Sequence, residues 1–102
     1  MPHFPTLDSD TRADVCVIGA GIAGLTTAYM LLREGKSVVV IDSVGIGAGE
    51  TGRSTAHMFP PDERFSELER GFGTEKAALV ADTYRRATDC VESIVRVEQI
   101  DC

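Results

Sequence analysis

A glycine-rich turn at a defined position constrains the fold of this chain more than any other feature. The turn has the pattern G-x-G-x-x-G, with Gly19, Gly21 and Gly24. It follows the largely β-branched run Asp14–Ile18, which predicts a strand buried on both faces of a sheet. In this context Gly19 permits a tight turn, Gly21 lets a diphosphate approach the backbone, and Gly24 lets a helix pack on the strand. The pattern therefore predicts a dinucleotide-binding turn.

The residues after the turn predict a helix and then a second strand. Four apolar side chains share one helical face: Ile22, Leu25, Tyr29 and Leu32. Gly35 is placed to end the helix, and Val38–Ile41 is a second β-branched run. Strand, helix and strand in this order form a βαβ unit with a right-handed crossover.

Asp42 ends the second predicted strand, 18 residues after Gly24. At this position a carboxylate can accept hydrogen bonds from the ribose hydroxyls of an adenine dinucleotide. Its negative charge disfavours the 2′-phosphate of NADP, which leaves NAD or FAD as the ligand.

A second glycine-rich segment follows at once and has the sequence G-I-G-A-G-E-T-G-R-S-T-A-H from Gly45 to His57. A simple NAD-binding unit usually continues instead with another helix and a third strand. With this segment included, the run from Asp14 to His57 resembles the N-terminus of the FAD-dependent D-amino-acid oxidase and glycine/sarcosine oxidase superfamily. It is especially similar to bacterial members that end in a Rieske iron–sulfur domain.

The resemblance implies a two-domain flavoprotein that oxidises the C–N bond of an amine or amino acid by hydride transfer to the flavin N5. The residues that would cradle the FAD diphosphate are Gly19, Gly21, Ile22, Ala23 and Gly24. Asp42 and Ser43 would lie near the adenosine ribose. The residues that would follow the diphosphate and ribityl chain are Thr51, Arg53, Ser54 and Thr55. No catalytic residue is assigned, because in this family the isoalloxazine carries the chemistry.

His57 raises the question of covalent flavin attachment. The segment T-G-R-S-T-A-H resembles T-x-G-S-T-W-H of dimethylglycine and sarcosine dehydrogenases, whose histidine is bonded to the flavin 8α-methyl carbon. Arg53 and Ala56 depart from that pattern, where the family has glycine and tryptophan. Non-covalent contact with the flavin edge and a plain surface histidine are the alternatives.

The remainder of the chain predicts two helices and no further strand. The first follows Pro60 and Pro61, has Asp62 as N-cap, and ends at Gly71 and Gly73 with an apolar face of Phe65, Leu68 and Phe72. Thr74 is placed to cap the second helix, whose apolar stripe comprises Val80, Tyr84, Ala87, Val91 and Ile94. Charged residues opposite the stripe indicate a solvated face. The predicted fold class is thus α/β: the N-terminal βαβ of a Rossmann-like FAD-binding domain followed by helices, with an incomplete sheet.

Residues 1–13 are expected to be a flexible leader and residues 14–102 the N-terminal portion of an FAD-binding domain. The resemblance implies a substrate domain that is absent here, so the chain is expected to be a truncated piece, inactive alone. An amine or amino-acid substrate would then bind only with the missing domain. The alternatives are a non-catalytic nucleotide-binding or interaction protein with a βαβ core, and an NAD-binding unit.

Composition limits the partners and the compartment. A net charge of −6 argues against nucleic acid and anionic membranes. The most apolar stretch carries glycines and threonines, so no transmembrane span is expected. Cys16, Cys90 and Cys102 form no C-x-x-C pair, which argues against a disulfide framework or a metal site and favours the cytoplasm. Cys16 lies in an apolar run and is expected to be buried.

Overall fold

The structure is a computed structural model that describes residues 4–58 and 62–102. The chain divides into two compact units, Met1–Thr55 and Ala56–Cys102, and each is described by itself. Within residues 4–13 the described backbone forms neither helix nor strand.

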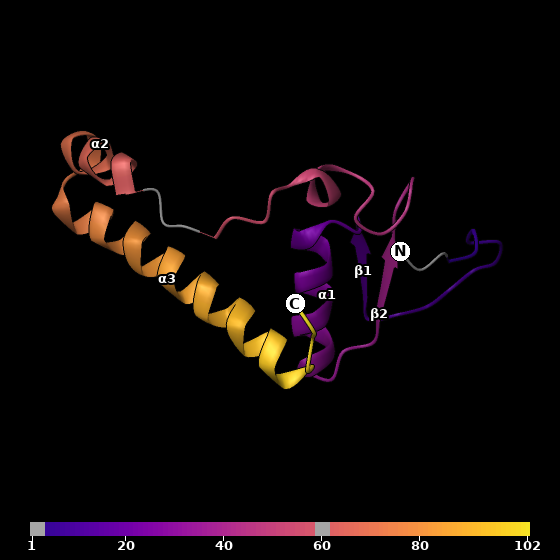
Figure 1. Cartoon of the computed structure of the whole chain (residues 1–102). Helices are drawn as coiled ribbons and strands as arrows, with labels where there is room; N and C mark the ends of the chain where they lie inside the picture. Colours follow the sequence, from indigo (N-terminus) through magenta and orange to yellow (C-terminus); the bar gives the residue numbers. More distant parts are fainter. Residues whose placement is uncertain (1–3, 59–61) are drawn as a thin grey trace. The chain divides into compact units, whose positions relative to one another are not determined.

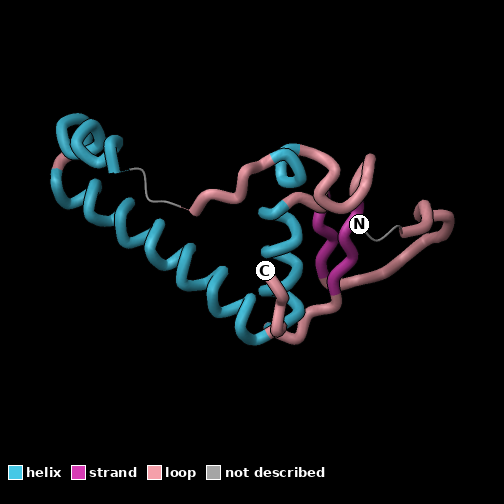
Figure 2. The backbone as a smooth tube through the Cα atoms, in the orientation of Figure 1, coloured by secondary structure: helices cyan, strands magenta, loops and turns pink. Residues whose placement is uncertain are grey.

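The first unit is the predicted βαβ (Figure 1). Strand β1 spans Val15–Ile18, helix α1 spans Ile22–Arg33, and strand β2 spans Val38–Ile41. The two strands lie side by side (Figure 2). They pair in parallel, with Val15 opposite Val38 and Ile18 opposite Ile41. The βαβ prediction is confirmed, and β1 begins one residue later than predicted.

The carboxylate of Asp14, just before β1, fastens the start of the sheet. It accepts hydrogen bonds from the backbone amide and the hydroxyl of Ser37, at 2.8 and 2.7 Å. The Ser37 hydroxyl oxygen in turn accepts from the Asp14 amide at 2.9 Å. The bonds from Ser37 lower the pKa of Asp14, so its ionised form is favoured. They also join the chain at the N-terminal ends of the two strands.

The two faces of β1 differ in exposure, contrary to the prediction of burial on both. Val15 and Val17 are half-buried, whereas Cys16 and Ile18 are exposed, and Ile18 is 83% exposed. Side chains alternate between the faces of a strand, and α1 packs on the strands from one side. The expectation of a buried Cys16 thiol is therefore wrong for this structure.

The predicted apolar face of α1 is confirmed in part, because Leu25 and Tyr29 are half-buried, but the packed side also includes small residues. Ala28 is buried, while Ile22 and Leu32 are 66% and 57% exposed. Gly24, one turn before Ala28, lies against the backbone of the turn. The buried stripe is thus rotated from the predicted one, because the helix approaches the sheet closely where its side chains are smallest. Gly35 ends the helix at φ +76°, as predicted.

The second unit is a helical hairpin. Helix α2 spans Asp62–Phe72 and packs against α3, which spans Thr74–Val97. Gly73 joins them at φ +87°. Leu68, Phe72, Val80 and Tyr84 line an open groove along the hairpin. The two helices are confirmed, but of their predicted apolar residues Phe72, Tyr84 and Ala87 are exposed, and the buried residue Ala77 lies outside the predicted stripe.

The helix caps differ from the prediction. Gly73, not Thr74, is the N-cap residue of α3, and no side chain caps that end. The Thr74 hydroxyl instead donates a 2.8 Å hydrogen bond to Glu69 Oε1. Pro60, Pro61 and the predicted cap by the side chain of Asp62 lie outside the described residues.

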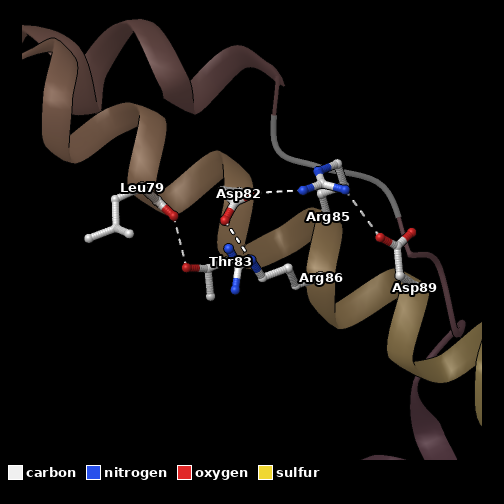
Figure 3. A network of polar contacts seen from close by, with 6 residues as sticks. All are labelled: Leu79, Asp82, Thr83, Arg85, Arg86 and Asp89. Atoms are coloured by element: carbon white, nitrogen blue, oxygen red, sulfur yellow. Dashed lines mark hydrogen bonds and ion pairs between the residues drawn. The ribbon is translucent and has the colours of Figure 1, made fainter.

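The polar face of α3 carries the predicted charges, which pair with one another (Figure 3). Asp82 contacts Arg85 at 2.7 Å and Arg86 at 2.6 Å, and Arg85 also contacts Asp89 at 3.3 Å. On the opposite stripe Val80, Val91 and Ile94 are half-buried, whereas Tyr84 and Ala87 are exposed. Among the helices in the described ranges, none combines the length and the hydropathy needed to cross a membrane.

Candidate functional site

Gly19 and Gly24 let the chain pass from β1 to α1 in a tight turn. Gly19 has φ +102°, a left-handed conformation that glycine adopts without strain, and its amide donates to the Ile41 carbonyl at 2.7 Å. A Cβ atom on Gly24 would lie 1.9 Å from the Gly19 carbonyl oxygen, a distance too short for any side chain. Both residues must therefore be glycine for the chain to turn this tightly.

The N-terminus of α1 presents free backbone amides. Gly21 is the N-cap residue and offers no capping side chain, and the first turn holds no acidic residue. The first helical hydrogen bond runs from the Leu25 amide to the Gly21 carbonyl, at 2.9 Å. Within residues 4–58 the amides of Ala23 and Gly24 have no such partner. Free amides and the positive end of the helix dipole favour an anion here.

Thr51 brings the second glycine-rich segment to this helix end. It lies in a short 3₁₀ helix, η1, over Glu50–Arg53, which the sequence did not predict. The Thr51 hydroxyl oxygen accepts a hydrogen bond from the Ile22 amide at 2.9 Å. A Cβ atom on Gly21 would lie 3.1 Å from that oxygen, so the absence of a side chain at Gly21 leaves room for the contact.

Asp42 lies at the end of β2 and binds backbone amides of both glycine-rich segments. Its Oδ2 accepts from the Ala20 amide at 2.8 Å, and its Oδ1 accepts from the amides of Val44 and Gly45, both at 2.8 Å. These bonds, led by the one from Ala20, lower the pKa of Asp42 to about 2. Asp42 is thus ionised at neutral pH and is held at the turn.

Gly47 makes a further connection that the sequence did not predict. Its amide donates to the Ala20 carbonyl at 2.8 Å, and both residues are buried. The crowding of small residues in the second segment was the available signal, but it did not specify which backbone groups would meet.

The remaining predicted site residues lie on the surface. Ser43, Arg53, Ser54 and Thr55 are exposed, and Arg53 forms a 3.7 Å ion pair with Glu50. His57 is exposed and belongs to the second unit. The first unit therefore brings together the turn, Asp42 and Thr51 from the predicted set.

This geometry suits the diphosphate of a dinucleotide. Gly21 leaves the N-cap position without a side chain, the amides of Ala23 and Gly24 supply donors, and the carboxylate of Asp42 lies where β2 ends. The residues present thus fit the FAD that the sequence predicts.

Comparison with known proteins supports the same ligand. The profile of the FAD dependent oxidoreductase (DAO) family matches residues 14–102. The chain is 40% identical, over its whole length, to YhfW of Bacillus subtilis, which is named as a Rieske 2Fe-2S iron–sulfur protein. It is 33% identical over 98% of its length to the oxidoreductase OrdL of Haemophilus influenzae. It is 30% identical over 97% of its length to gamma-glutamylputrescine oxidoreductase of Escherichia coli.

The chain spans only part of these relatives. It covers 20% of the Bacillus protein, 23% of the Haemophilus protein and 24% of the Escherichia protein. No solved structure matches the chain.

Proposed function

The chain belongs to the DAO family of FAD-dependent oxidoreductases, and from this premise we propose that residues 14–57 bind FAD for the oxidation of a C–N bond. The substrate would be an amine or amino acid, and the flavin would accept a hydride from it. The observation that carries the proposal is the N-terminus of α1, where the amides of Ala23 and Gly24 donate no hydrogen bond within residues 4–58.

The residues of the turn would hold the diphosphate. Amide donors at a helix N-terminus bind phosphate oxygens through hydrogen bonds and through the helix dipole. The hydroxyl of Thr51 is already at the helix end and keeps its proton available for donation, since its oxygen accepts from Ile22.

Roles for the other predicted residues follow from the family. Asp42 and Ser43 would lie near the adenosine ribose, and Arg53, Ser54 and Thr55 would follow the diphosphate and ribityl chain. Arg53 is suited to this role because its present partner, Glu50, is 94% exposed and 3.7 Å away, so the ion pair is weak. His57 would contact the flavin edge without a covalent bond. The alternative proposal is a covalent bond between His57 and the flavin.

Chemistry on an amine is supported by the relative named for gamma-glutamylputrescine. When bound, the flavin supplies the hydride acceptor, and the residues of this chain bind and orient it. The substrate would be held by parts of the polypeptide beyond this segment. We place the protein in the cytoplasm, on the sequence evidence given above.

The proposal is tested by flavin retention. The purified chain is incubated with FAD, desalted and examined by visible absorption, with far-UV circular dichroism to verify its helices. We expect the wild type and Gly71→Ala to retain flavin, because a Cβ atom on Gly71 would meet nothing within 4 Å. Gly24→Ala, which places a Cβ atom against the Gly19 carbonyl, should lose it.

A folded wild-type chain that stays colourless at high FAD concentration would contradict the proposal. If the wild-type chain retains flavin, acid precipitation of the loaded protein tests whether the flavin is bonded to His57. Flavin that remains with the pellet of the wild type and not with His57→Ala would establish attachment, and flavin released from both would exclude it.

A further inference from the structure

The carboxylate of Asp42 is occupied by the protein's own backbone. Oδ1 accepts two hydrogen bonds, from the amides of Val44 and Gly45, and Oδ2 accepts one from Ala20. A carboxylate offers about four lone-pair sites. At most one site on Oδ2 therefore remains for a ribose hydroxyl.

The amide that Oδ2 holds belongs to the residue at the centre of the turn. Ala20 is 3% exposed and lies between Gly19 and Gly21. Its amide is held by Asp42 and its carbonyl by the Gly47 amide, both at 2.8 Å. The peptide groups on either side of Ala20 are thus fixed, and with them the orientation of the chain entering α1.

The three contacts of Asp42 also join two segments that are separate in sequence. Gly45 begins the second glycine-rich segment and Val44 directly precedes it, whereas Ala20 belongs to the first segment. Loss of the carboxylate would release both segments at once. The effect would reach the whole helix end and not only the ribose.

We propose that Asp42 is a positioning residue, which acts on dinucleotide binding mainly by holding the Ala20 amide and so setting the turn, and only secondarily by contact with the ribose. This inference rests on the proposed function, because it assumes that the turn binds the adenosine diphosphate part of FAD. On this proposal, Asp42 affects the binding of the diphosphate more than the binding of the ribose.

The test separates the two roles with ADP and two deoxy analogues. ADP and 2′-deoxy-ADP are titrated by calorimetry into the wild type and into Asp42→Asn, and 3′-deoxy-ADP is used in the same way. Asparagine keeps one acceptor oxygen and places a donor where Ala20 needs an acceptor. We expect both ADP and its deoxy analogues to bind about tenfold more weakly or worse, by the same factor, since a hydrogen bond to a charged group is lost.

Asp14→Asn is the matched control. The carboxylate of Asp14 also accepts a backbone amide at 2.8 Å, from Ser37, but at the opposite end of the strands. Its replacement should lower stability and leave the affinity of the folded protein for all three ligands unchanged. Amide chemical shifts in the ligand-free protein provide a second measurement: Ala20 should shift in Asp42→Asn and not in Asp14→Asn.

The outcomes distinguish this inference from the proposed function. If Asp42→Asn weakens ADP alone, to the level of a deoxy analogue, Asp42 is a ribose ligand and the inference is overturned while the proposed function stands. An Ala20 amide that does not respond to Asp42→Asn also overturns it. A folded wild type that binds none of the three ligands counts against the proposed function itself.

Discussion

The Thr51 hydroxyl oxygen accepts a 2.9 Å hydrogen bond from the backbone amide of Ile22, a residue 29 positions earlier in the chain. Helix α1 begins at Ile22, and its own N-cap residue, Gly21, has no side chain to perform this task. Thr51 thus caps the helix from a distant segment. The glycine that leaves space for a ligand is compensated by a hydroxyl from the second glycine-rich segment.

Replacement of Thr51 by valine should destabilise the chain by about 1 kcal/mol, the usual effect of losing a capping hydroxyl. Valine keeps the shape of threonine and leaves the Ile22 amide without its acceptor. The measurement is the free energy of unfolding in urea, together with hydrogen exchange at the Ile22 amide, which should become faster. Thr51→Ser keeps the oxygen and should recover most of the loss. Equal stability of the valine and serine variants would contradict the capping role.

Gly24→Ala should destabilise the first unit strongly. The added Cβ atom would lie 1.9 Å from the Gly19 carbonyl oxygen and 3.3 Å from a methyl group of Val17. Overpacking usually costs about 1–3 kcal/mol, and we expect the upper end because the nearest atom is backbone. Gly71→Ala, in α2 and in open space, should instead be neutral or stabilising by up to about 1 kcal/mol. Chemical denaturation of both variants tests the prediction, and a Gly24→Ala protein as stable as the wild type would refute it.

The stability of the chain should depend on the ionisation of Asp42. Three backbone amides, with Ala20 first, lower the pKa of Asp42 from 3.8 to about 2. The native state therefore favours the carboxylate, so its contribution is complete above the ordinary pKa and is lost as the pH falls through about 2.

The pKa of Asp14 is lowered by Ser37 and that of Asp82 by Arg85. These two carboxylates therefore also contribute to the loss of stability in acid. Comparison with Asp42→Asn isolates one residue. The difference in unfolding free energy between this variant and the wild type should shrink between about pH 4 and about pH 2. A difference that is constant over this range would show that Asp42 is not held by the amides.

Asp82→Asn should destabilise α3 slightly and in a salt-dependent way. Asp82 pairs with both Arg85 and Arg86 on an exposed helix face, where ion pairs are weak and screened. The thermal midpoint should fall a little at low salt, and the difference from the wild type should vanish in high salt. Glu92→Gln, which removes a single pair with Arg96, should have a smaller effect. A larger effect of Glu92→Gln would show that the shared carboxylate adds nothing.

The local features of the fold were predictable from the sequence because they depend on near neighbours. The turn at Gly19, the helix end at Gly35 and the strand Val38–Ile41 all lie where the pattern placed them. Each depends on backbone freedom or on a β-branched run, which are properties of the residues themselves.

The errors concern burial and caps, which depend on distant segments. The exposure of Cys16 and Ile18 follows from which face of the sheet α1 covers, and a β-branched run does not carry that information. The Thr74 cap failed because Gly73 took the N-cap position and Glu69 offered the threonine hydroxyl another partner.

By itself the sequence determined the βαβ order, the glycine turn and the family, because glycine spacing and hydrophobic periodicity are local constraints on the backbone. Only the tertiary structure decided that Thr51 caps α1 and that Asp42 Oδ2 is occupied by the Ala20 amide. Hydrogen bonds between segments more than 20 residues apart depend on the path of the whole chain. For that reason sequence spacing placed these residues at the site without showing what their polar atoms bind.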